Sequence, residues 1–434
     1  MADSARVEPL NPDPEAANAE AEAEAPQSGH GRLSKTLTAT KNHCLFTLPV
    51  PLWVLYLVLA VVLFLVLRAL FYWIMVSSGI SAYAPTISIL GINYWHGQWE
   101  MGDSKLKSAK LKLTTSKDIK DEGVKNALLN LGPDSSKQDL ERLDSYIKKN
   151  KIDVVTFGMS EWKIEPLLKL YAKGWPLSAP LTNQGMSNEA GLLRVVDKDN
   201  FQQTMKDNGL ESYTIPSYKA ASLVTCKELA TPESADPVSD RCQIDEDAVT
   251  KEGAVFPLFV KPVQGAGGTS HAELYKKVDT REALAEFFNT PVKTSNGGYK
   301  FILPSDFTVQ EWVTSKYEDS FHFVYSEEHG GFLKLKITRD EYQSDDAVAH
   351  HNPTRKRTTL ERDFVPKQMV ENFGKLLRAV NYRGIGCFDM KYRNSDLSQP
   401  MVMEMNPRIC GSQPHFHDYG AWVRAWTRLY VVKE

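Results

Sequence analysis

The sequence contains few cysteines. Only five occur among 434 residues, at positions 44, 226, 242, 387 and 410. An odd, sparse set argues against a disulfide framework, although Cys226 and Cys242 lie in one polar stretch where a local bridge is conceivable. No C-x-x-C pair occurs, which argues against a zinc knuckle.

The sequence also lacks a strong excess of charge and any internal repeat. Lysine and arginine number 51 against 54 acidic residues, a net charge of −3 with a pI near 6.4. Nucleic-acid binding usually requires a clustered basic surface, so we expect no nucleic-acid partner. The length allows two or three domains, and the oligomeric state cannot be read from the composition.

The N-terminal segment lacks large apolar side chains. Residues 1–31 are rich in alanine, glutamate and proline, which cannot bury enough surface to fold, so we expect residues 1–44 to form a disordered acidic tail. The segment also lacks the arginine-rich amphipathic pattern of a mitochondrial transit peptide.

One long apolar run, residues 49–76, follows this tail. Its length predicts a transmembrane helix with the lipid bilayer as partner, the alternative being a buried core helix. Arg68 is expected near one membrane interface. Basic residues at 32, 35 and 41 predict a single-pass protein with a cytosolic N-terminus. The large domain has no usable N-x-[ST] sequon, which favours the opposite topology, so the side of the membrane that holds this domain stays open.

The region after the apolar run alternates between strand and helix patterns. Residues 86–92 and 151–158 are apolar and β-branched, as in buried strands. Residues 136–150 and 161–174 have apolar side chains at helical spacing. This order predicts a parallel α/β layer, which we place at 85–190.

The pattern changes towards an α+β arrangement in the remaining sequence. A helix is expected over 187–208, and residues 226–253 and 340–363 read as an exposed insertion and a long loop. Strands are predicted at 213–224, 255–263, 271–278, 308–313, 321–326, 332–337, 387–393 and 400–408. Further helices are predicted at 281–288, 366–380 and 414–431.

A glycine-rich turn follows one predicted strand in FVKPVQGAGGTSH, residues 259–271. Glycines at 265, 267 and 268 would let backbone N–H groups approach an anion. Lys261 on the strand could add a point charge over phosphates. The alternative is an ordinary β-hairpin. The motif is not a P-loop, because G-x-x-x-x-G-K-[ST] is absent.

Carboxylates are embedded in two apolar strands near the C-terminus. FDMKYR carries Asp389, and MVMEMNPR carries Glu404 and Asn406, two residues apart and therefore on one face. If the strands pair antiparallel, Asp389 lies across from them, and three oxygen ligands suited to Mg²⁺ converge. Arg408 lies on the same face and could stabilise transferring phosphate charge. The alternative is a surface hairpin with scattered acids.

Together these segments resemble the ATP-grasp ligases over roughly residues 86–431. E-M-N-P-R-I-x-G-S at 404–412 is similar to the metal-binding strand of the carbamoyl-phosphate-synthetase and biotin-carboxylase branch. The stretch 195–216 resembles the helix that enters the grasp module. The resemblance implies a preceding α/β domain and an ATP-grasp domain at 191–434, with a glycine-loop subdomain at about 213–315 and a metal-binding subdomain at about 316–434.

The resemblance also implies ligands and roles. ATP with Mg²⁺ or Mn²⁺ would be bound, the metal by Asp389, Glu404 and Asn406. Arg408 and Lys261 would act in catalysis. The nucleotide would be bound by Lys198, Lys261, Gly265, Gly267, Gly268, Glu311 and Val313.

The implied reaction joins a small carboxylate or amino acid to an amine acceptor through an acylphosphate. Two alternatives stay open: an inactive nucleotide-binding scaffold, and a phosphotransferase of the same fold. Cys387 stands where the D-alanine ligase branch has a catalytic arginine, which puts membership of that branch in doubt. No A-M-K-M motif appears, so biotin-dependent carboxylation is disfavoured. Lys336 and Arg339 could face the phosphates or the substrate, and the basic triplet 355–357 could bind a substrate carboxylate. The alternative for both is a solvated surface.

Overall fold

The structure is a computed structural model. It describes residues 51–77, 84–92, 103–158, 161–183, 194, 196–228, 236–238, 240–263, 272–293, 298–347 and 355–431. The chain divides into two units, Met1–Val66 and Leu67–Glu434. The predicted disordered tail, 1–44, lies outside the described residues, so its disorder stays a prediction.

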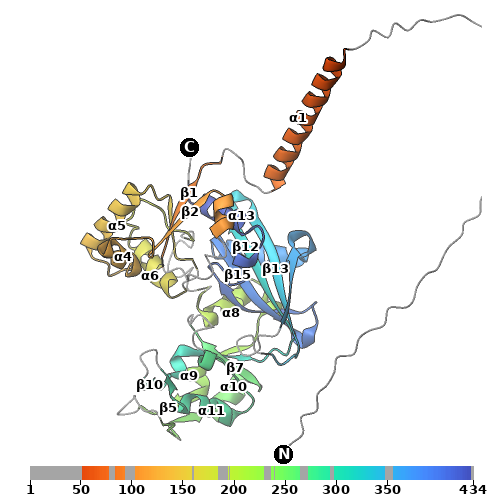
Figure 1. Cartoon of the computed structure of the whole chain (residues 1–434). Coiled ribbons are helices and arrows are strands. Elements are labelled where there is room, and N and C mark those ends of the chain that lie inside the picture. Colours follow the sequence, from red (N-terminus) through yellow and green to blue (C-terminus); the bar gives the residue numbers. More distant parts are fainter. Residues whose placement is uncertain are drawn as a thin grey trace, which may run out of the picture. The chain divides into compact units, whose positions relative to one another are not determined.

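Helix α1 spans Leu52–Ser77 (Figure 1). In the part of the chain that the structure describes, no helix combines the length and the apolar character needed to cross a bilayer. The prediction of a transmembrane helix at 49–76 is therefore wrong, and so is the single-pass membrane localisation drawn from it.

The first sheet is parallel, with the order β2-β1-β3. Its strands are β1 (Ile87–Gly91), β2 (Leu111–Thr115) and β3 (Val154–Thr156). The neighbouring helices are α3 (Asp103–Ser108), α4 (Glu122–Leu129), α5 (Lys137–Lys149) and α6 (Glu161–Ala172). Asp121 and Ser136 cap α4 and α5 by accepting hydrogen bonds from first-turn N–H groups. The predicted parallel pairing is confirmed.

The second sheet is antiparallel throughout. Its strand order, β4-β11-β7-β8, differs from the order of the strands along the chain. Its strands are β4 (Ser217–Lys219), β7 (Leu258–Pro262), β8 (Lys276–Val278) and β11 (Phe307–Glu311). Around it lie α9 (Ala220–Leu223), α10 (Glu246–Glu252) and α11 (Arg281–Asn289), and the two-stranded pairs β5 (Val224–Cys226) with β6 (Cys242–Ile244) and β9 (Val292–Lys293) with β10 (Tyr299–Lys300).

Two predictions for this region are wrong. The expected strand at 213–224 is interrupted by α9, because Ala220 and Leu223 turn inward onto the core instead of alternating across a sheet. The expected insertion at 226–253 contains β6 and α10, which Asp245 caps through its side chain.

The third sheet is five-stranded and antiparallel, with the order β14-β13-β12-β15-β16. Its strands are β12 (Tyr317–Ser326), β13 (Gly331–Tyr342), β14 (Arg355–Glu361), β15 (Arg383–Tyr392) and β16 (Pro400–Asn406). The helices that pack against it are α8 (Lys198–Asp207), α12 (Lys367–Ala379) and α13 (Tyr419–Arg428). Residues 340–363 were expected to form a loop, but 355–361 pair with β13 as an edge strand.

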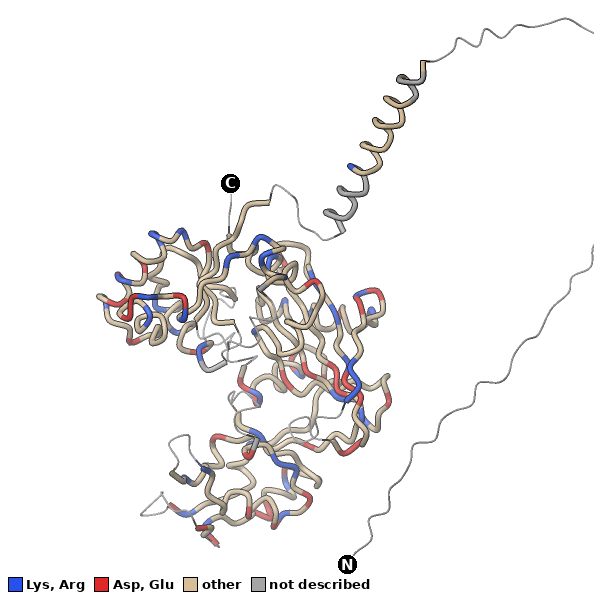
Figure 2. The backbone as a smooth tube through the Cα atoms, in the orientation of Figure 1, with Lys and Arg blue, Asp and Glu red and all other residues tan. Residues whose placement is uncertain are grey.

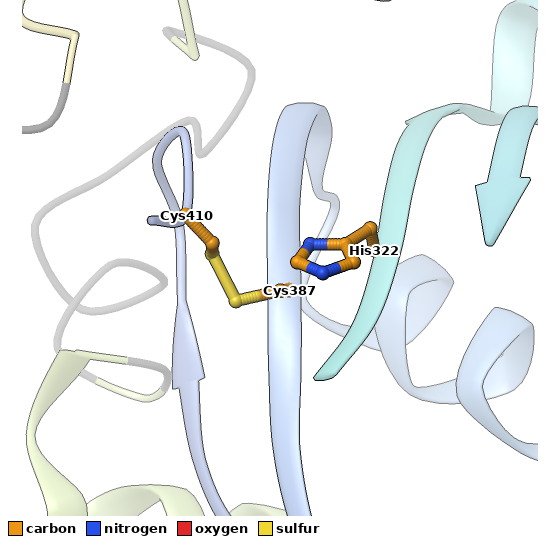
Figure 3. A group of neighbouring side chains, drawn as sticks. All are labelled: His322, Cys387 and Cys410. Atoms are coloured by element: carbon orange, nitrogen blue, oxygen red, sulfur yellow. A yellow bond between two sulfur atoms is a disulfide. The ribbon is translucent and has the colours of Figure 1, made fainter. Parts of the chain in front are cut away.

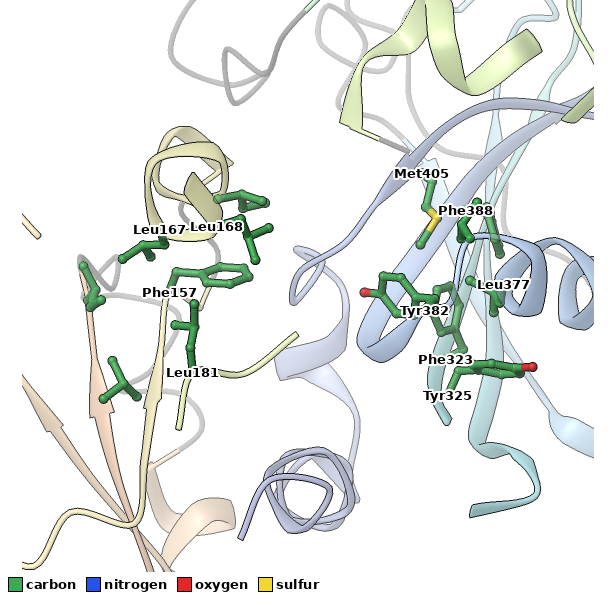
Figure 4. Packing of buried hydrophobic residues seen from close by; sticks show 14 of the residues in the cluster. Phe157, Leu167, Leu168, Leu181, Phe323, Tyr325, Leu377, Tyr382, Phe388 and Met405 are labelled. Atoms are coloured by element: carbon green, nitrogen blue, oxygen red, sulfur yellow. The ribbon is translucent and has the colours of Figure 1, made fainter. Parts of the chain in front are cut away.

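One face of this sheet packs into the largest hydrophobic core. Phe321, Phe323 and Phe388 point to this side, and Phe373 of α12 lies 4.5 Å from Phe388 between ring centroids. Figure 4 shows Phe323, Phe388 and Met405 within this packing. The apolar face fixes the register of the strands, since a slip of one residue would bury the opposite set of side chains.

Helix α8 begins at Lys198. Of the earlier part of the predicted helix, 187–197, residues 194 and 196 are helical, and 187–193 and 195 lie outside the described residues. Asp197 is its N-cap and accepts hydrogen bonds from the N–H groups of Asp199 and Asn200. The helix stops just before Gly209, whose φ of +71° suits glycine. The N-cap therefore places Lys198 at the first position of the helix.

Candidate functional site

The opposite face of the five-stranded sheet is polar along the first part of β12. On β12, Glu318, Ser320 and His322 alternate with the core residues Phe321 and Phe323. Successive side chains of a strand point to opposite faces, so the three polar residues share one side of the sheet. This polar face provides the floor of the candidate site.

Three cross-strand neighbours continue this floor. Ser320 of β12 lies opposite Asp389 of β15, which lies opposite Glu404 of β16. Ser320 Oγ donates to Asp389 Oδ1 at 2.6 Å. Asn406 Nδ2 donates to the other oxygen, Asp389 Oδ2, at 2.7 Å. The structure thus brings together the three predicted metal ligands, Asp389, Glu404 and Asn406.

The donor chemistry of this group fits a hard divalent cation. It offers two carboxylates and an amide oxygen from adjacent strands, and oxygen ligands of this kind suit Mg²⁺. Arg408 lies beside them, and its Nη2 donates to Asn406 Oδ1 at 3.2 Å. The predicted catalytic arginine therefore borders the predicted metal site.

Two lysines from other elements approach Glu404. Lys198 Nζ of α8 lies 3.5 Å from Glu404 Oε2, and Lys261 Nζ of β7 lies 4.0 Å from the same oxygen. Lys261 Nζ also donates to the carbonyl of Met403 at 3.1 Å. The lysine side chains are only 8% and 5% exposed, whereas that of Glu404 is 28% exposed. Glu404 thus offers a partly open carboxylate between two enclosed ammonium groups.

Burial and charge act in opposite directions on these groups. Burial lowers the pKa of Lys261 to about 8, even though Glu404 opposes the shift. Burial alone would raise the pKa of Glu404, but Lys198, Lys261 and Arg408 outweigh it and hold that pKa well below its ordinary value. Glu404 is therefore ionised at neutral pH, and Lys261 titrates close to the physiological range.

The predicted base-binding residues lie beside an apolar cluster. Val313 packs with Ile215, Met401 and Met403. Met403 also supplies the carbonyl that Lys261 contacts, so the apolar cluster adjoins the lysine pair. A flat apolar base next to anionic phosphates requires this combination of surfaces.

The second predicted base contact, Glu311, ends β11. Its carboxylate forms an ion pair with Arg393, with Oε1 2.5 Å from Nη1. The ion pair joins the end of β11 in the second sheet to the residue that follows β15 in the third. Its predicted contact with a nucleotide stays a prediction.

Part of the predicted site lies outside the described residues. Gln264–His271 is not described, so the positions of Gly265, Gly267 and Gly268 are not known. The described chain stops at Val263, whose N–H donates to the carbonyl of Asp306. The role of the glycine turn as a phosphate cradle stays a prediction.

Sequence reasoning missed a carboxyl on the polar floor. Glu318 lies opposite Lys391 of β15 and Asp340 of β13. Burial raises the pKa of Glu318 to about 7, Lys391 opposes the shift, and Asp389 adds to it. The alternation of polar and apolar residues in EDSFHF could have predicted this position, because it places Glu318 and Ser320 on one face.

Four of the other basic candidates have acidic partners: Lys336, Arg339, Arg355 and Arg357. Lys336 Nζ lies 2.9 Å from Asp418 and 3.0 Å from Glu361. Arg357 donates twice to Asp340 at 2.7 Å. Figure 2 shows basic and acidic residues interspersed along the chain.

A disulfide that the sequence did not suggest lies next to the metal-ligand candidates. Cys387 of β15 is bonded to Cys410, which follows β16, at a sequence separation of 23. The conceivable bridge between Cys226 and Cys242 is also formed. The argument against disulfides from a sparse, odd count was therefore wrong, since four of the five cysteines form pairs, one across β5 and β6 and one between β15 and the segment after β16.

No family model matches the sequence, and no curated protein matches it. Among solved structures the chain is similar to N5-carboxyaminoimidazole synthetase from Staphylococcus aureus with ADP, at 12% identity and a TM-score of 0.48, covering 80% of this chain and 79% of that one. It is also similar to biotin carboxylase from Campylobacter jejuni with βγ-ATP, at 12% identity, TM-score 0.46 and coverage of 80% and 72%.

A third similar structure is the L-amino acid ligase from Bacillus licheniformis, at 12% identity, TM-score 0.45 and coverage of 80% and 75%. At 12% identity these similarities concern the fold alone.

Proposed function

We propose that the chain is an ATP-dependent ligase that joins a small carboxylic acid to an amine through an acylphosphate. The observation that carries the proposal is the meeting of Lys198 and Lys261 at Glu404, which lies directly opposite Asp389. One site thereby combines lysine cations that can bind phosphates with carboxylate oxygens that can bind a metal ion.

Each group has a role in this proposal. Mg²⁺ held by Asp389, Glu404 and Asn406 would neutralise phosphate charge. Lys198 and Lys261 would bind phosphate oxygens, and the apolar cluster of Ile215, Val313, Met401 and Met403 would hold the base. The predicted glycine turn would close over the phosphates and exclude water.

The proposed reaction has two steps. A carboxylate oxygen of the substrate attacks the γ-phosphorus of ATP, which gives an acylphosphate and ADP. The amine nitrogen then attacks the acyl carbon, phosphate leaves, and the nitrogen loses one proton. Arg408, next to Asn406, would stabilise the charge that develops on the transferred phosphate. Catalysis on this scheme is positioning and charge neutralisation.

The test is ADP and phosphate formation by the full chain with MgATP and a matrix of acids and amines. We expect both products only when an acid and an amine are present, and an acid hydroxamate when hydroxylamine replaces the amine. Amine-independent ADP formation with a stable phosphorylated product would indicate a phosphotransferase. Nucleotide binding with no acceptor-dependent ADP across the matrix would indicate an inactive scaffold.

A pair of lysine variants makes this test specific. Lys261→Met removes the enclosed ammonium of β7. Lys276→Met changes an exposed lysine on β8 of the same sheet. We expect the first to lose turnover and the second to retain it. Equal activity of the two variants would contradict the proposed role of Lys261.

A further inference from the structure

Three side chains that favour soft metals meet beside the polar floor. They are His322 of β12, Cys387 of β15 and Cys410 in the segment after β16. One ligand atom from each lies within 4.8 Å of the others, and all three residues are buried. Figure 3 shows the imidazole of His322 next to the disulfide that joins the two cysteines.

His322 has an unused ring nitrogen. Its Nε2 lies 2.8 Å from Ser412 Oγ, and its side chain is fully buried. Its Nδ1 has no hydrogen-bond partner among the residues that the structure describes. A buried polar atom without a hydrogen-bond partner destabilises the fold, so an isolated nitrogen at this point requires an explanation. A metal ion bound in the reduced protein provides one.

The backbone geometry allows the two sulfur atoms to bind one ion. Zinc–sulfur bonds of about 2.3 Å at a tetrahedral angle place two sulfur atoms about 3.8 Å apart. The Cα atoms of Cys387 and Cys410 are 6.4 Å apart, towards the wide end of the range for bonded cysteines. Side-chain rotation can therefore separate the sulfur atoms without moving the strands.

We propose that the reduced thiols of Cys387 and Cys410, together with His322, form a binding site for Zn²⁺. A dithiol reductant first gives two electrons and two protons to the disulfide and itself becomes a disulfide. Zn²⁺ then binds both sulfur atoms, two protons leave, and Nδ1 of His322 donates the third bond. This set leaves one coordination position open.

Ser412 has a supporting role in this site. When Nδ1 binds the metal, Nε2 carries the proton and donates to Ser412 Oγ. A hydrogen bond from the second ring nitrogen fixes the orientation of a metal-binding imidazole. Thiolate and imidazole ligands select Zn²⁺ over Mg²⁺, so this site differs in chemistry from the oxygen ligands nearby.

The two sites are adjacent. Cys387 Sγ lies 3.7 Å from Asp389 Oδ1 and 3.8 Å from Asn406 Nδ2. Cys410 Sγ lies 3.5 Å from the carbonyl oxygen of Arg408. Exchanging the disulfide for a metal would thus change the surroundings of the proposed Mg²⁺ ligands. The zinc site itself requires no ligase activity.

The experiment compares the oxidised and reduced full chain. The reduced sample is made with a water-soluble phosphine, which takes its oxygen from water and becomes a phosphine oxide. Both samples are incubated with zinc chloride alone and desalted, and their zinc and free thiols are counted. We expect the reduced chain to hold about one more zinc ion than the oxidised chain. Co²⁺ in place of zinc should give thiolate-to-metal charge-transfer absorption.

The second disulfide provides the matched control. Cys226→Ser with Cys242→Ser removes a pair of thiols that, among the described residues, belongs to no such group of ligands, and should leave the zinc gain unchanged. Cys387→Ser with Cys410→Ser should abolish the gain, and His322→Asn should remove the tetrahedral cobalt spectrum.

Two results would overturn the proposal. The first is a reduced wild-type chain whose thiols are all counted as free but which gains no zinc. The second is a zinc gain that persists in the Cys387 and Cys410 double variant. The comparison of oxidised and reduced wild-type chain remains decisive even where a buried variant fails to fold. Because it measures metal content, its result does not depend on the proposed ligase reaction.

Discussion

Glu404 of β16 and Lys261 of β7 lie 4.0 Å apart, carboxylate oxygen to ammonium nitrogen, although they belong to different sheets. Lys198 approaches the same oxygen from α8. A pair of enclosed cations at one partly open carboxylate is costly unless further negative charge arrives, because burial penalises the charged forms. Nucleotide phosphates would supply that charge, which is why this contact is central to the proposed function.

Glu404→Gln tests this relationship directly. The amide keeps the shape of the side chain but removes a metal ligand and the charge between the two lysines. We expect turnover to fall by about 100-fold or more, with the melting temperature little changed. Acceptor-dependent ADP formation and differential scanning fluorimetry measure the two effects. Glu361→Gln, on the exposed edge strand β14, is a control that should retain activity. A fully active Glu404→Gln chain would remove the metal role from this residue.

Nucleotide binding should take up a proton above neutral pH. Burial lowers the pKa of Lys261 to about 8, so part of the free protein carries a neutral amine at pH 8.5. Bound phosphates favour the ammonium form, and binding at this pH should therefore draw a proton from solution. Calorimetry in buffers of different ionisation enthalpy counts that proton.

The same measurement at pH 6.5 is the first control, because Lys261 is already charged there and no uptake is expected. Lys261→Arg is the second, since an arginine does not titrate in this range. Identical proton counts at pH 6.5 and 8.5 in the wild-type chain would contradict the lowered pKa.

The sequence predicted the elements whose side chains alternate or repeat clearly. MVMEMNPR places Glu404 and Asn406 on one face among apolar residues, so their meeting with Asp389 followed from strand pairing alone. Strand β14 could not be predicted, because its side chains are exposed almost throughout and its pairing with β13 depends on backbone hydrogen bonds at a sheet edge.

Contacts between segments that are distant in the sequence could not be predicted either. Cys387 and Cys410 meet because β15 and β16 pair in one register, which the spacing of the cysteines does not reveal. The ion pairs that occupy Lys336 and Arg357 depend in the same way on strand order. Local patterns identify which face a residue occupies, but sheet topology decides its partners.

Glu318→Gln should change how stability depends on pH. The pKa of Glu318 is raised from 4.5 to about 7 in the folded protein, chiefly by burial. The folded state therefore binds more protons than the unfolded state between these values, so this group's contribution is full below pH 4.5 and is lost as the pH rises through 7. A glutamine stays neutral and avoids that loss.

We expect the melting temperature of Glu318→Gln to be a few degrees higher than that of the wild type at pH 8 and equal to it at pH 4.5. Melting is followed in EDTA, so that no metal ion contributes. Glu141→Gln, on the exposed side of α5, should leave the melting temperature unchanged at both pH values. A wild-type advantage at pH 8 would show that Glu318 is stabilised as a carboxylate.

Asp319→Ala should destabilise the fold strongly. Asp319 is fully buried and accepts two hydrogen bonds from Arg339, at 2.9 and 2.8 Å, and another from the hydroxyl of Tyr392. Removing one partner of a buried pair leaves the other charge uncompensated and costs about 3–5 kcal/mol. For a chain of this size we expect the melting temperature to fall by roughly 10 °C. Glu141→Ala breaks the exposed Lys137–Glu141 pair, 3.8 Å apart, and should cost almost nothing. Equal losses from the two variants would show that burial does not set the strength of the Asp319 contact.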